Sequence, residues 1–182
     1  MWIWLCVIAG SVVLDQLTKW AAITFLKGGE SFSVIPSVFR FTYVENDGAA
    51  FGMLDDQRWV FMLVSSVAIV GLLIFLWKFA PDSLWAKAGI AMIIGGGIGN
   101  MIDRVALGYV VDFLDFCAFP EIWPWVFNVA DAFVCVGGGI VFVWCVCSMI
   151  AETRQAKAKK DAGESREQLE NGENASSDGD SV

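Results

Sequence analysis

The sequence contains no histidine among its 182 residues, and this absence removes several kinds of active site at once. Serine and cysteine nucleophiles that depend on a histidine base are excluded, and so is any metal site with histidine ligands. The five cysteines lie mostly within apolar segments, where cysteine behaves as a small hydrophobic residue. Carboxylates alone are a poor ligand set for catalytic zinc, so we expect neither a metal nor another cofactor.

Charged residues are nearly absent from four long apolar segments. One of these segments, 59–77, has no charged residue, and each of the others has only one or two. About 20 such residues are needed to cross a bilayer, and a soluble core could not absorb segments this long and this uniformly apolar. We therefore predict an all-α membrane protein with four transmembrane helices, at 1–26, 59–77, 86–102 and 127–150.

The charges that flank these segments predict the orientation of the chain. Segment 1–26 lacks the basic start and the clear cleavage site of a signal peptide, so we expect it to be retained as the first span. The basic residues Arg154, Lys157, Lys159 and Lys160 follow the last span and place that end of the chain in the cytoplasm. Four spans then put the N-terminus in the cytoplasm too.

Two parts of the chain outside the predicted spans have a distinct character. Aromatic residues at 39, 41 and 43 alternate with polar ones, which is typical of a half-buried strand, and Asn46-Asp47-Gly48 predicts a turn. We expect a small external β-rich cradle at about 27–57, between the first and second spans of a membrane domain over 1–150. Residues 151–182 have almost no large apolar side chains, so we predict a disordered, charged cytoplasmic tail with a transiently helical stretch at 154–170.

Ionisable side chains within spans are candidates for function because their burial must be compensated. Asp15 and Lys19 are spaced i,i+4 with the acid first, and can be interpreted as a mutually neutralising structural pair. Asn100, Asp103 and Arg104 share one helical face, where Asp103 and Arg104 are candidates for hydrogen-bonded supports.

Glycine is concentrated in two runs within the predicted spans. The run at 95–99 contains a Gly-x-x-x-Gly pair, and a second run occupies 137–139. Neither is a phosphate-binding loop, since no strand precedes the first run and no Lys-Ser/Thr pair follows it. Both runs indicate close packing between helices through small faces.

Two further aspartates have no obvious basic partner in their own segments. Asp112 lies just beyond the outer end of the third predicted span, and Asp131 lies about one turn inside the fourth, so both are expected at the same depth near the outer surface. Two neighbouring carboxylates are what an aspartyl protease requires, because one holds a proton while the other deprotonates a water molecule.

Four stretches resemble the signature blocks of the lipoprotein signal peptidases (signal peptidase II). They occur in the family's order and cover most of the chain before the tail: DQLTKW at 15–20, ENDGAAFGML at 45–54, GNMIDRVALGYVVDF at 99–113 and FNVADAFVCVG at 127–137. The resemblance implies an aspartyl endopeptidase of the bacterial inner membrane. In this family the enzyme removes the signal peptide from diacylglyceryl-modified prolipoproteins and cleaves just before the lipidated cysteine.

The resemblance also implies the roles of particular residues. The catalytic acids of the family match Asp112 and Asp131. The expected supporting or substrate-binding residues within the matched blocks are Asn46, Gly48, Asn100, Asp103, Arg104, Asn128, Asp15 and Lys19. Lipid-modified prolipoprotein signal peptides and membrane lipids are the expected partners, with no nucleic acid and no obligate protein partner. The active site is expected near the outer, periplasmic face.

Two other functions compete with this one. A small ion- or proton-coupled transporter would use Asp15, Lys19 and Asp131 as an ion path, but it would favour inverted repeats and charges near the middle of the membrane, and the sequence shows neither. A structural scaffold would explain the glycines and leave the two unpaired aspartates unexplained.

Overall fold

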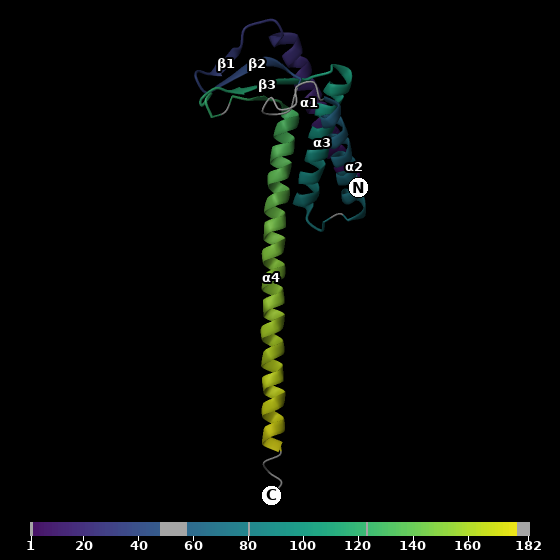
Figure 1. Cartoon of the computed structure of the whole chain (residues 1–182), viewed down its shortest axis with the longest axis vertical. Coiled ribbons are helices and arrows are strands. Elements are labelled where there is room, and N and C mark those ends of the chain that lie inside the picture. The colour runs from purple at the N-terminus through teal and green to yellow at the C-terminus, as the bar shows by residue number, and fades with distance from the viewer. Residues whose placement is uncertain (1, 48–57, 80, 123, 178–182) are drawn as a thin grey trace. The chain divides into compact units, whose positions relative to one another are not determined.

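The computed structural model describes residues 2–47, 58–79, 81–122 and 124–177 of the chain (Figure 1). It divides into two compact units, Met1–Val141 and Phe142–Val182, and the first unit contains every described candidate residue of the site. The elements in chain order are α1 (Trp2–Leu26), β1 (Phe32–Ile35), β2 (Phe39–Asn46), α2 (Arg58–Lys78), α3 (Leu84–Ala106), β3 (Val110–Phe116), β4 (Val126–Phe127) and α4 (Val129–Ser177).

Each of the four helices overlaps one of the four apolar segments of the sequence, and α4 extends well beyond its segment. Within the first unit, α1 and α3 pack along one another, and α2 packs on α3 (Figure 1). Two helical segments in the described parts of the chain are long and apolar enough to cross a membrane, namely α1 and Val129–Lys157 of α4. The apolar part of α2, Met62–Lys78, is shorter. The fold is therefore mostly helical with two clear apolar helices, and the four transmembrane spans stay a prediction.

Glycines allow the backbone of α3 to approach two other helices. A Cβ added at Gly95 would lie 2.6 Å from the Ser11 Cβ of α1, and one added at Gly96 would lie 2.4 Å from the Ala130 carbonyl oxygen of α4. Both distances are shorter than real Cβ atoms tolerate, so the predicted close packing of helices through small residues is confirmed here. In the second run, 137–139, only the first glycine has such a contact.

The strands form one antiparallel sheet in the order β1-β2-β3-β4. The predicted strand at 39–43 is confirmed by β2, and the sheet also contains β3 and β4, which follow α3 and lie outside the predicted β-rich segment at about 27–57. Strand β3 contains Asp112 and Asp115, although aspartate is rare in strands. The strand forms nevertheless because it is buried on nearly every residue and pairs with β2, where Val44 lies opposite Asp112.

Helix α4 continues to Ser177, whereas the sequence predicts a disordered tail from about residue 151. The segment is rich in alanine, lysine, glutamate, glutamine and arginine, which have the highest helix propensities. Local propensity thus accounts for a helix in a segment that has little apolar surface to bury.

The contact at Gly96 generates a prediction about stability. Gly96→Ala should lower the stability of the folded protein by about 1–3 kcal/mol, because the new methyl group meets a backbone oxygen that cannot move aside. Gly10→Ala is the matched control, since nothing lies within 4 Å of its added Cβ. Thermal unfolding of both variants in detergent measures the difference, and equal stability of the two would contradict this account of the packing.

Candidate active site

The two aspartates lie on adjoining elements of the first unit. Asp112 is in β3 and only 2% exposed, and Asp131 is the third residue of α4 and half-buried. Both carboxylates are held by amide donors from other segments of the chain. Asp112 accepts hydrogen bonds from the Asn46 side chain at Oδ2 (2.7 Å) and from the Asn128 side chain at Oδ1 (2.7 Å). Asp131 accepts one from the Asn100 side chain at Oδ1 (2.8 Å).

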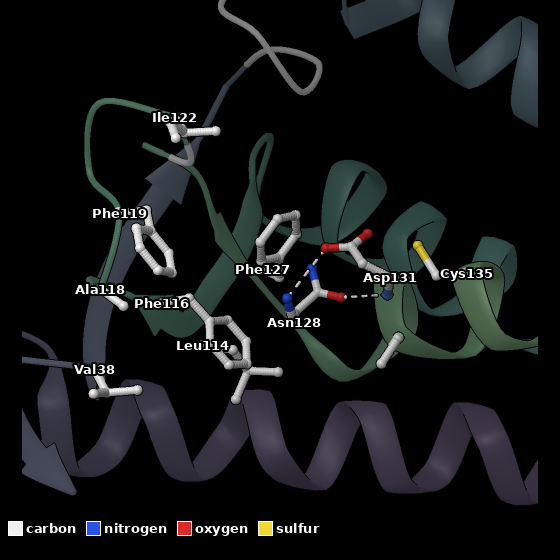
Figure 2. A pocket seen from close by; sticks show the side chains of 11 residues that line it. Val38, Leu114, Phe116, Ala118, Phe119, Ile122, Phe127, Asn128, Asp131 and Cys135 are labelled. Atoms are coloured by element: carbon white, nitrogen blue, oxygen red, sulfur yellow. Dashed lines mark hydrogen bonds between the residues drawn. The ribbon is translucent and has the colours of Figure 1, made fainter. Parts of the chain in front are cut away.

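Asn128 contacts both aspartates and is fully buried. It caps α4, because its Oδ1 accepts the Asp131 N–H (2.9 Å) while its own N–H donates to Asp131 Oδ2 (3.1 Å), as Figure 2 shows. Its Nδ2 donates to Asp112 Oδ1 and also to Asn100 Oδ1 (3.0 Å). The Asn128 side-chain amide therefore links Asp112 to Asn100, whose own amide donates to Asp131.

The two carboxylates have different electrostatic surroundings. Burial disfavours the charged form of Asp112 and, with a smaller contribution from the negative charge of Asp131, raises its pKa to about 7. The hydrogen bonds from Asn46 and Asn128 and the positive charge of Lys19 act in the opposite direction. Asp131 lies in the first turn of α4, where the helix dipole and the capping N–H favour a negative charge. Burial thus favours a proton on Asp112, whereas Asp131 lies at the N-terminus of a helix.

A buried ion cluster supports the two aspartates from the side of α1. Lys19 Nζ lies 3.0 Å from Asp15 Oδ2 and 2.9 Å from Asp103 Oδ2, and it donates to Asn100 Oδ1 at 2.8 Å. The predicted pair of Asp15 and Lys19 is confirmed and extends to α3. Because Lys19 occupies the oxygen of the Asn100 amide, the nitrogen of that amide is directed at Asp131.

Arg104 adds a second positive charge to the same region. Its guanidinium donates to the Asn100 carbonyl oxygen (3.3 Å) and interacts electrostatically with Asp131, Asp112 and Asp103. Asp103 and Arg104 are both hydrogen-bonded in this region, and their role as supports of the two aspartates stays a prediction. Gly48 lies outside the described residues.

An apolar pocket of about 690 Å³ lies beside Asp131. Its lining comes from the sheet, the loop between β3 and β4 and the first turns of α4, and Asp131 and Asn128 are at its edge (Figure 2). The lining residues that Figure 2 labels on the sheet include Leu114 and Phe127, and Cys135 contributes from α4. Sequence reasoning missed this pocket, because its residues are apolar and only the fold brings them together.

Sequence reasoning also missed Gln16. Its side-chain amide donates to Asp15 Oδ2 (3.2 Å) and to Asp103 Oδ1 (3.0 Å). The available signal was its position within the polar face of α1, three residues before Lys19.

Within the described residues, no three cysteine or acidic side chains lie where they could hold a metal ion.

A comparison with known protein families finds one match along most of the chain. The family model described as signal peptidase (SPase) II matches residues 7–147, which include all the site residues above. The chain belongs to the signal peptidase II family. It is 40% identical to the lipoprotein signal peptidase of Halalkalibacterium halodurans over 151 residues (83% of this chain and 94% of the relative) and 47% identical to that of Caldanaerobacter subterraneus over 135 residues (74% and 90%).

Solved structures resemble the chain as well. A bacterial membrane enzyme with 32% sequence identity has a TM-score of 0.75, over 82% of this chain and 90% of that one. A second, also with 32% identity, has a TM-score of 0.72 over 80% and 93%. The comparisons support a membrane-bound protease of the signal peptidase II family, and none of them supports a transporter.

The two roles of Asn128 can be separated by substitution. Asn128→Ala should lower stability by about 1 kcal/mol through loss of the helix cap, whereas Asn128→Ser keeps a capping oxygen and should largely preserve stability. Both variants remove the amide donor to Asp112, so both should lose peptidase activity. Measured per folded molecule, near-normal cleavage by the serine variant would show that the amide is not needed.

Proposed function

We propose that the protein is an aspartyl endopeptidase of the bacterial inner membrane that removes the signal peptide from diacylglyceryl-modified prolipoproteins, with Asp112 and Asp131 as the catalytic pair. The observation that carries this proposal is the linkage of the two carboxylates through Asn128, next to an apolar pocket. Membership of the signal peptidase II family supports the activity, and the names of the relatives support prolipoproteins as the substrates.

The surroundings of each aspartate favour a division of labour. Asp131 is half-buried at the N-terminus of α4, and we assign it the role of the base, which takes a proton from a water molecule whose oxygen attacks the scissile carbonyl carbon. Asp112 holds a proton and donates it to the carbonyl oxygen as the tetrahedral intermediate forms. The proton on Asp131 then passes to the leaving amide nitrogen as the C–N bond breaks. Reformation of the carbonyl returns the other proton to Asp112, which restores the starting state.

The pocket beside Asp131 supports an apolar substrate. Its wall is formed by aliphatic and aromatic side chains, and the polar residues of its lining are Asn128 and Asp131. We propose that an apolar part of the precursor next to the scissile bond occupies this pocket. Its occupation removes water from the neighbourhood of Asp131 and positions the bond there.

The proposed topology has four spans, with both termini in the cytoplasm and the dyad near the periplasmic face. It is supported by the family and by the two helical segments that are long and apolar enough to cross a membrane. It is also supported by α2, whose exposed side chains include Leu63, Val64 and Val67. Exposed apolar surface of this extent on a helix is expected where the helix faces lipid. We also propose a membrane domain over residues 1–150, followed by a charged cytoplasmic segment.

The dyad predicts the effect of three substitutions. Asp112→Asn and Asp131→Asn should each reduce precursor cleavage by about 10²- to 10⁴-fold or more, because each removes either the proton or the base. Asp115→Asn is the matched control: Asp115 is also a buried aspartate of β3, but its carboxylate binds Arg40 and Thr42. Processing of a lipidated precursor in membranes with equal amounts of each variant is the measurement. The dyad assignment fails if either dyad variant retains turnover similar to that of the control.

The raised pKa of Asp112 predicts the alkaline side of the pH profile. Asp112 must hold its proton, so kcat/KM should fall as the pH rises through about 7. The hydrogen bond from Asn46 lowers this pKa, so Asn46→Ala should move the alkaline limb to higher pH in addition to lowering the maximal rate. Thr42→Val, on the same strand but away from the dyad, should leave the limb in place. A limb that moves to lower pH in Asn46→Ala would contradict the assignment of the proton to Asp112.

A further inference from the structure

Two buried carboxylates bind the backbone at matching points beside the dyad. Asp15 Oδ1 accepts a hydrogen bond from the N–H of Ala130, the residue before Asp131, at 2.9 Å. Asp103 Oδ2 accepts one from the N–H of Val111, the residue before Asp112, at 3.0 Å. Each aspartate of the dyad therefore follows directly after a backbone amide that is fixed by another carboxylate.

Two donors on α1 bridge these carboxylates. Lys19 Nζ lies 3.0 Å from Asp15 Oδ2 and 2.9 Å from Asp103 Oδ2. Gln16 Nε2 donates to Asp15 Oδ2 (3.2 Å) and to Asp103 Oδ1 (3.0 Å), and it also lies 3.2 Å from the Gly99 carbonyl oxygen. The bridge is continuous from the backbone of β3 to the backbone of α4.

We propose that Asp15, Gln16, Lys19 and Asp103 form a clamp that fixes the separation of Asp112 and Asp131, with Gln16 as a positioning residue for the peptidase reaction. The clamp rests on the proposed function of the dyad and deepens it. None of its members is required to touch the substrate. They act through the Cα positions of the two catalytic residues, because the fixed amides lie one peptide bond away from them.

The geometry explains why such a clamp is needed. Asp112 and Asp131 belong to different elements, β3 and α4, which are joined by the short strand β4, by the packing of Val129 against the core cluster of β3 and by the side-chain contacts of the site. Catalysis by two carboxylates depends on hydrogen-bond distances to one water molecule and one carbonyl group, and a displacement of about 1 Å costs about 10²-fold in rate. Asn128 ties the side chains together, and the clamp ties the backbones.

Gln16 is the best member to test, because it is neutral. Removal of Lys19, Asp15 or Asp103 would leave an unpaired buried charge and would confuse positioning with misfolding. Gln16→Met keeps the length of the side chain and removes the donor. Gln16→Asn keeps the amide but is one methylene too short to span the same two carboxylates. Thr18→Val is the control, since within the described part of the chain the Thr18 hydroxyl donates to backbone oxygens of α1, those of Leu14 and Asp15.

The experiment measures steady-state cleavage of a lipidated precursor by the full-length protein in detergent, per folded molecule and over a range of pH. We expect both Gln16 variants to lower kcat by about 10- to 100-fold with KM within twofold, because positioning affects the transition state and not substrate binding. We also expect the alkaline limb of the pH profile to move to lower pH. If the clamp loosens, Asp112 moves away from Asp131, and the negative charge of Asp131 then raises the pKa of Asp112 less. The positive charges of Lys19 and Arg104 stay in place. Thr18→Val should match the wild type in both measurements.

Three results would overturn the clamp. The first is wild-type kcat in both Gln16 variants, whatever their stability. The second is a rise in KM of the Gln16 variants with kcat unchanged. The third is a loss of kcat in Thr18→Val equal to that in the Gln16 variants. The Gln16→Asn variant keeps the test decisive if Gln16→Met does not fold. Failure of the clamp can be told apart from failure of the proposed function. Cleavage by Asp112→Asn or Asp131→Asn would contradict the proposed function, whereas the Gln16 variants test the clamp alone.

Discussion

The candidate active site depends on one buried cation. Lys19 is 2% exposed and lies between Asp15 and Asp103, with Asn100 as its third partner. A buried charge is tolerated only when it is paired and fully hydrogen-bonded, so these four side chains must assemble together or not at all. Asp15 and Asp103 also accept hydrogen bonds from backbone amides of α4 and β3. The partners needed by the Lys19 ammonium group therefore join α1, α3, β3 and α4 at one point.

Close packing of the helices makes this assembly possible. A Cβ added at Gly99 of α3 would lie 2.4 Å from Asp15 Oδ2, so the carboxylate reaches its partners only because this residue has no side chain. Small residues commonly bring helices together in membranes, where apolar surface alone gives no preference for a partner helix over lipid. In this protein the glycine contacts also determine where charge is placed. The packing of α3 and the chemistry of the dyad therefore share the same residues.

The sequence predicts some parts of this arrangement much better than others, and the reasons are physical. The helices follow from long apolar runs, and the pair of Asp15 and Lys19 follows from a local i,i+4 spacing. Strand β3 does not follow, because burial and pairing with β2 override the low strand propensity of its aspartates. The contacts of Asn128 depend on where β3 and α4 meet, which no local pattern encodes. Gln16 gives little signal, since a neutral amide on a helix surface is usually unremarkable until its partners are known.

The two aspartates are unequal before any substrate arrives. Asp112 is buried under two amide donors, whereas Asp131 is half-buried at the N-terminus of a helix and at the edge of an apolar pocket. The surroundings already distinguish the two members, because burial raises the pKa of Asp112 whereas Asp131 lies at a helix N-terminus. An apolar group that fills the pocket removes water next to Asp131, and this strengthens its interaction with every remaining charge in the site. In the proposed mechanism, binding of the apolar part of the substrate and activation of the base are then one event, because both occur at the same wall of the pocket.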